Sequence, residues 1–163
     1  MIKVLVSACL IGERVRYNGE VMSHDSSILV HWQSQGRVVP FCPEVAAELS
    51  VPRPSSEITG GDGITVLRGY ARVMNIDGQD VTEYFLDGAD KALDLARSQG
   101  VKLAILKEGS PSCGSTYIYD GSFSGAHKPG KGVTVALLEE KDIRVFSERE
   151  ISKAAAYLKT FET

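Results

Sequence analysis

Three cysteines are the residues of this 163-residue chain best suited to chemistry. Cys9, Cys42 and Cys113 each stand where a short apolar run stops and a turn begins. The carboxyl ends of neighbouring parallel strands point into one crevice, where ligands usually bind. The pattern therefore predicts that three thiols distant in sequence meet at one place. Three thiolates around one point form a metal or iron–sulfur site with a vacant position, and a vacant position permits chemistry.

A simpler interpretation exists for any one of these residues, because a buried thiol is often only a small apolar side chain. Three cysteines that all follow strand-like runs favour a shared site. Their number is odd, and the chain has no C-x-x-C pair. These features argue against a disulfide scaffold, a zinc ribbon and a thioredoxin-like motif, and they predict reduced thiols.

Residues beside the cysteines add acid–base and hydroxyl groups. Glu44 lies two positions after Cys42, where its carboxylate could serve as an acid or base, although it could equally cap a following helix. Ser110 and Ser112 precede Cys113 in a glycine- and proline-containing turn. Such a turn can direct hydroxyls and backbone N–H groups at an anion or at cluster sulfide, or it can be an ordinary connection.

Polar residues in two loops close to the cysteine-bearing turns are candidates for substrate contacts. Arg16 and Asn18 follow Cys9 in a polar segment, and Arg53 lies in a proline-stiffened loop beyond Cys42. The alternative for Arg53 is a local salt bridge with Glu57.

Short apolar runs alternate with helical periodicity along the chain, which predicts a layered α/β fold. The predicted strands are 2–8, 37–41, 101–106 and 143–146, with a small hairpin formed by 64–67 and 71–74. The predicted helices are 26–35, 45–49, 81–99, 133–141 and 148–161. Asp80 and Glu83 resemble a capping box at the start of the strongest helix. We expect residues 1–163 to form a single domain with a mainly parallel sheet.

The composition narrows the classes of partner. The net charge of −3, from 18 basic and 21 acidic residues, gives no electrostatic surface for a nucleic-acid polymer. No apolar run approaches the roughly 20 residues that span a bilayer. The chain starts with a strand-like run instead of a signal-like leader, so we expect a cytoplasmic location. No sequence feature indicates an oligomeric state.

Several motifs make the sequence resemble the thiouracil desulfidase (TudS) family, long known as a domain of unknown function. The resemblance extends to about residue 148. The matching segments are Ser7-Ala8-Cys9-Leu10, Arg16-Tyr17-Asn18-Gly19, Cys42-Pro43-Glu44-Val45, Pro52-Arg53-Pro54, Asp80-Val81-Thr82 with Phe85, Ile105 to Gly114, and Tyr119 to Gly125.

This resemblance implies a Rossmann-like three-layer domain and a 4Fe–4S cluster held by Cys9, Cys42 and Cys113, with one iron open. It also implies that Glu44 is catalytic and that Ser110, or less directly Ser112, is the catalytic serine. The implied reaction is non-redox desulfuration of a small thio-substituted heterocycle such as thiouracil, which gives the oxo base and sulfide. A protein of this kind would also depend on the iron–sulfur assembly machinery.

Two other hypotheses use the same thiols. A non-catalytic iron–sulfur module could sense oxygen or pass sulfur to a partner, and it would have no need of Glu44 or Ser110. A zinc ion held by three thiolates and water would favour ordinary hydrolysis.

Overall fold

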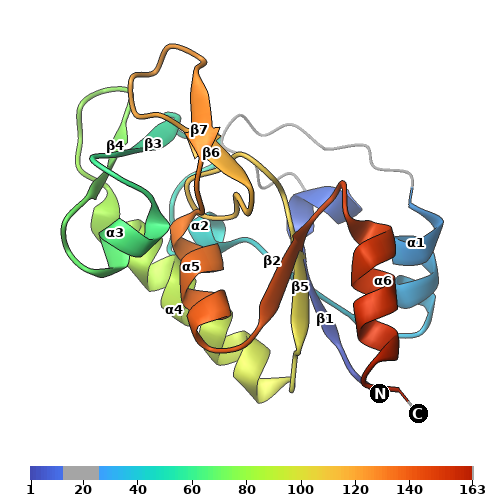
Figure 1. The fold of residues 1–163 in the computed structure, drawn as a ribbon. Helices are drawn as coiled ribbons and strands as arrows, with labels where there is room; N and C mark the ends of the chain where they lie inside the picture. Colours follow the sequence, from blue (N-terminus) through green and yellow to red (C-terminus); the bar gives the residue numbers. More distant parts are fainter. Residues whose placement is uncertain (13–25, 163) are drawn as a thin grey trace.

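A sheet of four parallel strands forms the centre of the protein in the computed structural model, which describes residues 1–12 and 26–162 (Figure 1). In sheet order the strands are β2 (Val38–Phe41), β1 (Val4–Ser7), β5 (Leu103–Leu106) and β8 (Arg144–Ser147). Parallel neighbours need long crossover connections, which here contain helices. The predicted α/β class with a mainly parallel sheet is confirmed.

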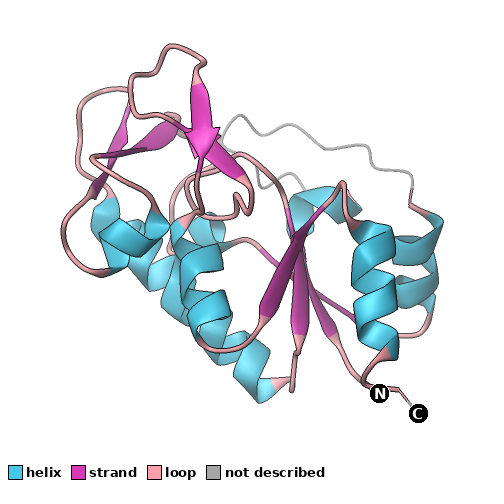
Figure 2. Ribbon diagram, viewed as in Figure 1, coloured by secondary structure: helices cyan, strands magenta, loops and turns pink. Residues whose placement is uncertain are grey.

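Helices cover both faces of the sheet, which gives the fold three layers (Figure 2). One face carries α1 (Ser27–Ser34) and α6 (Ile151–Lys159), and the other carries α4 (Thr82–Ser98) and α5 (Val133–Glu140). The predictions of these four helices are confirmed to within a few residues at their ends. Among the described residues, no helix combines the length and apolar character needed to cross a bilayer.

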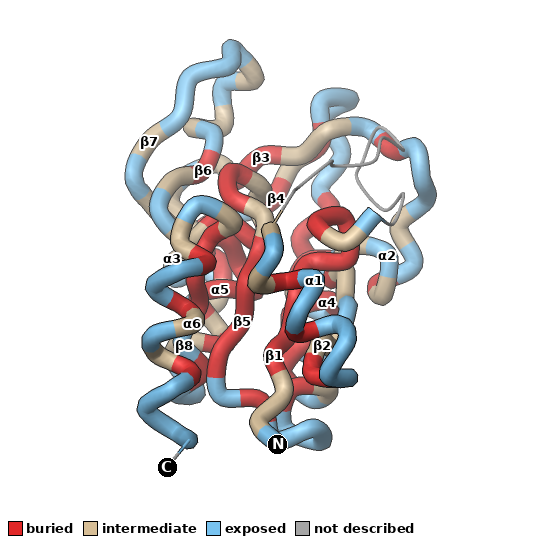
Figure 3. Tube along the Cα trace, turned by 90° about the vertical axis from the view of Figure 1, so that its right-hand side faces the viewer, coloured by how far each residue is buried: buried red, intermediate tan, exposed pale blue. Residues whose placement is uncertain are grey.

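The two central strands, β1 and β5, are buried along their whole length (Figure 3). Successive side chains of a strand point to opposite faces, so each strand supplies both cores. Val4 and Val6 pack with Trp32 in one core, whereas Leu5 packs with Leu93 in the other. This two-sided burial explains why both strands read as continuous apolar runs.

Two antiparallel hairpins and three short helices complete the fold. The hairpins are β3 (Ser56–Thr59) with β4 (Arg72–Asn75), and β6 (Tyr117–Tyr119) with β7 (His127–Pro129). The short helices are η1 (Ala8–Ile11), α2 (Pro43–Ala46) and α3 (Gly63–Leu67). Both hairpins lie at the end of the molecule where the strands of the central sheet finish (Figure 1). They pack over a third core that includes Ile58, Phe85 and Ile118.

The predicted hairpin of 64–67 with 71–74 is wrong, because the first of these segments belongs to helix α3. The Asp62 carboxylate accepts hydrogen bonds from the N–H groups of Ile64 and Thr65, and the Thr65 hydroxyl accepts one from the Asp62 N–H. This capping box stabilises a helix over residues with β propensity. The strand that pairs with β4 is β3, which lies in a segment rich in proline, serine and glycine and outside every predicted strand.

Two smaller predictions also need correction. Asp80 and Glu83 form no capping box, because Asp80 instead accepts hydrogen bonds from the Thr82 N–H at 3.0 Å and from Arg72 at 2.7 Å. The short helix predicted at 45–49 begins earlier, at Pro43, with Cys42 as its N-cap residue. Proline suits this first position because it lacks an N–H that would otherwise need a partner.

Candidate active site

All three cysteines line one cavity of about 330 Å³ at the carboxyl end of the sheet. Cys9 lies in η1 directly after β1, Cys42 directly follows β2, and Cys113 lies in the loop after β5. These strands are consecutive neighbours in the sheet, in the order β2-β1-β5. The topology therefore brings three sequence-distant thiols to one wall, and the volume lies within the range of small-molecule sites.

The thiols are close enough to influence one another electrostatically. Burial raises the pKa of the Cys113 thiol, the Ser112 hydroxyl opposes this, and Cys42, Glu44 and Cys9 raise it further. Burial likewise raises the pKa of Cys42. Several groups that could carry negative charge thus share a space with little solvent, a setting in which a cationic centre would favour the thiolate forms.

A cluster and a single metal ion require different spacings of the cysteine ligands. Within residues 1–12 and 26–162, no three His, Cys, Asp or Glu side chains are grouped as ligands of one ion. A 4Fe–4S cluster is larger, and each of its thiolates binds a different iron. Cys9, Cys42 and Cys113 line one shared cavity.

Glu44 lines the same cavity and is held on both of its oxygens. Its Oε1 accepts a hydrogen bond from Arg53 Nε at 3.1 Å, and its Oε2 accepts one from Ser112 Oγ at 3.0 Å. The side chains of Arg53 and Glu44 are only 5% and 14% exposed, so this ion pair is largely shielded from water. The ion pair of Arg53 is with Glu44, and its Nη1 also donates to the Ser50 carbonyl at 3.0 Å. Glu57 instead accepts backbone N–H groups of Gly121 and Phe123.

The two serines form a directional chain that leads to Glu44. Ser110 Oγ accepts the Cys113 N–H at 2.7 Å and lies 3.1 Å from Ser112 Oγ. A hydroxyl has one proton to donate. The Ser112 hydroxyl has two acceptors within reach, Glu44 Oε2 at 3.0 Å and Cys113 Sγ at 3.4 Å. When its proton goes to Glu44, Ser110 is the donor between the two serines. Ser110 lines the cavity, whereas Ser112 is 1% exposed and lies behind it.

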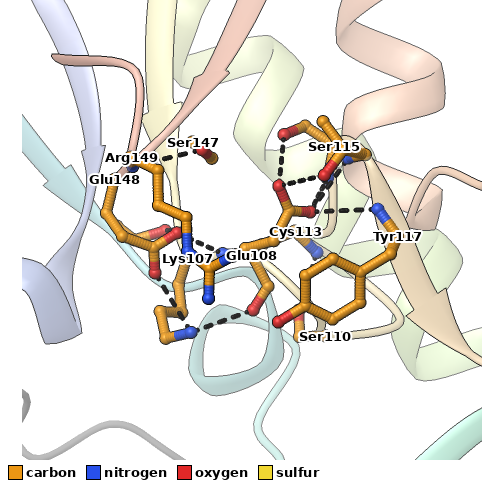
Figure 4. Close-up of polar contacts among 11 residues, drawn as sticks. Lys107, Glu108, Ser110, Cys113, Ser115, Tyr117, Ser147, Glu148 and Arg149 are labelled. Atoms are coloured by element: carbon orange, nitrogen blue, oxygen red, sulfur yellow. Dashed lines mark hydrogen bonds and ion pairs between the residues drawn. The ribbon is translucent and has the colours of Figure 1, made fainter. Parts of the chain in front are cut away.

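A buried carboxylate, Glu108, fixes the loop that carries these serines and Cys113 (Figure 4). Its Oε1 accepts N–H bonds from Ser115, Thr116 and Tyr117 at 2.7 to 3.3 Å. Its Oε2 accepts the hydroxyls of Ser115 and Thr116. Burial alone would raise the pKa of Glu108, but these hydrogen bonds outweigh it and leave the pKa lowered. The sequence analysis assigned no role to Glu108.

Lys107 ties the end of β5 to the segment that follows β8. Its Nζ pairs with Glu148 Oε2 at 3.0 Å and donates to the Glu108 carbonyl, as Figure 4 shows. Its N–H donates to Ser7 Oγ at the end of β1. Lys107 also lines the cavity that the three cysteines line, and its positive charge is balanced there by the carboxylate of Glu148.

Apolar rings form much of the remaining cavity wall. Phe41, Tyr117, Tyr119 and Phe123 contribute these rings, and Ile76 stands with them. The loop carrying Phe123 lies between β6 and β7. A flat heterocycle would find surface for stacking here. Of the three predicted substrate contacts, Arg53 lines the cavity, and Arg16 and Asn18 lie outside the described residues.

Gly88 of α4 allows the turn that carries Cys42 to approach closely. A Cβ at this position would lie 2.3 Å from the carbonyl oxygen of Pro43, a distance that no side chain can occupy. The helix therefore packs directly on the backbone of α2. This contact sets the position of the turn containing Cys42 and Glu44.

Replacing Gly88 with alanine should destabilise the protein by about 1–3 kcal/mol, because the new methyl group must displace α2. Helix propensity alone would give the opposite sign, since alanine is favoured over glycine by about 1 kcal/mol within a helix. Urea unfolding of the metal-free protein measures the change. Asp90→Ala, on the exposed side of α4, is the control. If Gly88→Ala has the same free energy of unfolding as the wild type, then α2 can shift to accommodate the methyl group without loss of stability.

Comparisons with known proteins identify the family of this chain. Residues 4–150 match the family model described as 2-thiouracil desulfurase. The chain is 45% identical over 150 residues to the uncharacterized protein YbbK of Bacillus subtilis (strain 168), covering 91% of this chain and 97% of that protein. It also resembles a solved structure of the 4Fe–4S-dependent thiouracil desulfidase TudS, with a TM-score of 0.89 and 43% identity over 98% of this chain and 99% of that chain. The chain therefore belongs to the 2-thiouracil desulfurase family of enzymes.

Proposed function

We propose that this protein is an iron–sulfur-dependent desulfidase that converts a thio-substituted nucleobase, such as thiouracil, to the oxo base and sulfide. The observation that carries the proposal is the convergence of Cys9, Cys42 and Cys113 on the cavity that also contains Glu44. Family membership and the likeness to TudS support the same reaction class. The proposed unit is the whole chain, residues 1–163, acting as one domain.

The donor set fits a 4Fe–4S cluster with three protein ligands. Cys9, Cys42 and Cys113 would each bind one iron, which leaves the fourth iron for a ligand other than these thiolates. Such a cluster supplies, when bound, a thiophilic Lewis acid that can polarise a thiocarbonyl.

The reaction needs one water and no electron transfer. The water oxygen forms a bond to the ring carbon, the carbon–sulfur bond breaks, and the sulfur leaves as hydrosulfide. The oxygen keeps its place as the new carbonyl, so the ring carbon stays at the same oxidation level. The two protons of the water must be taken up by protein groups, by the sulfur or by solvent.

Glu44 is the proposed base for the first of these protons. Its carboxylate lines the cavity, and the guanidinium of Arg53 on Oε1 fixes its orientation. Ser110 faces the cavity and is connected through Ser112 to Glu44 Oε2. A proton accepted at Ser110 can pass along these two hydroxyls to the carboxylate, as general acid–base catalysis requires. We therefore assign Ser110 to the substrate side of the relay and Ser112 to its interior.

Anaerobic reconstitution with iron and sulfide, followed by assay of sulfide release, tests this function. We expect about four irons per chain and stoichiometric formation of uracil and sulfide from 2-thiouracil or 4-thiouracil. A complete cluster that releases no sulfide from any thiolated base would favour the sensor or sulfur-transfer module. Binding of zinc with no uptake of iron would support the zinc hypothesis. Either outcome would overturn the proposed reaction.

A further inference from the structure

Glu57 is a buried acidic residue in the wall of the cavity that the proposed mechanism does not use. It lies in β3 of the first hairpin and is 8% exposed. Its strand neighbour Ile58 packs in the core below the hairpins, so Glu57 points the other way. It is one of the residues that line the cavity, alongside Tyr117 and Phe123.

One oxygen of Glu57 holds the loop between β6 and β7. Oε1 accepts the N–H of Gly121 at 2.9 Å and the N–H of Phe123 at 3.2 Å. Phe123 has a φ of +56°, a left-handed backbone conformation that is unfavourable for a residue with a side chain. The carboxylate therefore stabilises a strained loop that places an aromatic ring at the cavity.

The loop is also fitted closely to β3. Gly121 has a φ of +93°, and a Cβ there would lie 2.7 Å from the Ile58 carbonyl oxygen. The loop tip thus lies against the strand that carries Glu57. This close packing means that a neutral residue of the same size at position 57 should leave the loop in place.

The second oxygen of Glu57 has no donor among the described residues. The hydrogen bonds from Gly121 and Phe123 both end on Oε1. Among the described residues, the buried side-chain oxygen or nitrogen without a partner is Thr134 Oγ1, so Oε2 of Glu57 is not sealed from solvent. Glu57 lines the cavity, and an oxygen with two acceptor positions and no protein donor can accept a hydrogen bond from a ligand there.

We propose that Glu57 determines substrate specificity by accepting, at Oε2, a hydrogen bond from a ring N–H of the base, while Oε1 positions Phe123 against the ring face. This inference rests on the proposed function. A thio-substituted pyrimidine carries N–H groups beside its thiocarbonyl and carbonyl carbons, so it supplies the missing donor. The aromatic wall covers the apolar faces of the same ring.

The proposal predicts which bases the cavity rejects. A ring whose N–H is replaced by N-methyl offers no donor to Oε2 and adds bulk beside it. Sites built to bind a polar group discriminate strongly against analogues that lack it, because the protein group is left unpaired. We expect one of the two N-methylated 2-thiouracils to be a much poorer substrate than 2-thiouracil itself.

The test compares Glu57→Gln with the wild type, using reconstituted protein and two readouts. Glutamine can still accept the N–H groups of Gly121 and Phe123 through its amide oxygen, but it presents an N–H₂ donor in place of Oε2. Calorimetric binding of uracil should weaken about 10- to 100-fold, the range expected for a hydrogen bond to a charged group. KM for 2-thiouracil should rise by a similar factor, with a smaller effect on kcat. Glu140→Gln, an exposed substitution on α5, is the control and should change neither readout.

Methylated substrates test the same contact in the unaltered protein. In the wild type we expect kcat/KM to fall at least tenfold for 1-methyl- or 3-methyl-2-thiouracil, and this penalty should shrink in Glu57→Gln. Two results would overturn the inference while the desulfidase activity stands. One is equal affinity of the variant and the wild type for uracil. The other is a fall in kcat/KM on N-methylation that is as large in the variant as in the wild type. A wild-type protein that releases no sulfide from any base overturns the proposed function, and the inference falls with it.

Discussion

Replacing Glu44 with glutamine should lower kcat for sulfide release by about 10²- to 10⁴-fold, the range typical for loss of a general acid–base group. The iron content should not change, because the three thiols that we assign to the cluster are intact. Glutamine fills the same space, and its amide oxygen can accept one of the two hydrogen bonds that Arg53 and Ser112 now make. The loss should therefore reflect proton transfer and not misfolding. Anaerobic assay of sulfide release, with iron determined in the same sample, measures both quantities.

Three further variants separate the role of Glu44 from that of its neighbours. Glu44→Ala should be at least as inactive as Glu44→Gln. Ser112→Ala should give an intermediate loss, because it interrupts the relay from Ser110 but leaves the carboxylate at the cavity. Glu140→Gln, which removes an exposed charge, should retain full activity. Turnover at the wild-type rate in Glu44→Gln would remove this residue from the mechanism.

The position of the cysteines could be predicted because it follows from one rule about parallel sheets. A strand-like run ends before each of Cys9, Cys42 and Cys113, and parallel strands finish at one edge. The rule does not give the order of the strands. In the structure β1 lies between β2 and β5, and this order makes the three thiols neighbours. A different order with the same local pattern would have separated them.

The residues that sequence analysis missed share a physical cause. Glu57 and Glu108 act through backbone N–H groups of loops distant in sequence, at Gly121 and Phe123 for one and within 115–117 for the other. Such contacts produce no recognisable motif in the sequence, because every residue except proline has a backbone N–H that can be the donor. The β3–β4 hairpin was misplaced for a related reason. Residues 56–59 stand among turn residues and show their strand character only when paired with 72–75.

The sequence around Ser112 indicates a site, but it does not show which of the two serines faces the cavity and which contacts Glu44. The motif Ser110-Pro111-Ser112-Cys113 gives two hydroxyls of equal chemistry. Their roles differ because the turn directs Ser110 to the cavity and Ser112 inward to Glu44. The partner of Ser112 is 68 residues away in sequence. Only the packing of α2 against the loop after β5 can distinguish the two serines.

Replacing Cys113 with alanine should remove the cluster and with it all detectable sulfide release. Iron after reconstitution should fall from about four atoms per chain to fewer than one, because two remaining thiolates would have to hold a cluster that normally has at least three. The metal-free protein should still fold. Cys113 is buried and joins the core on the α4 and α5 side of the sheet, so alanine keeps the apolar contact and loses only the volume of the sulfur.

Cys9→Ala and Cys42→Ala should behave in the same way if the three thiols act as one ligand set. The chain has no fourth cysteine to serve as a matched control, so the metal-free wild type is the reference for folding. Far-ultraviolet circular dichroism should show equal helix content in all four proteins, while only the wild type regains iron and activity. Full iron and normal turnover in any one of the three variants would exclude that cysteine as a ligand. Because the cysteines come from three adjacent strands, an exclusion at Cys42 alone would move the site toward β1 and β5, away from Glu44, and would weaken the proposed role of that carboxylate as the base.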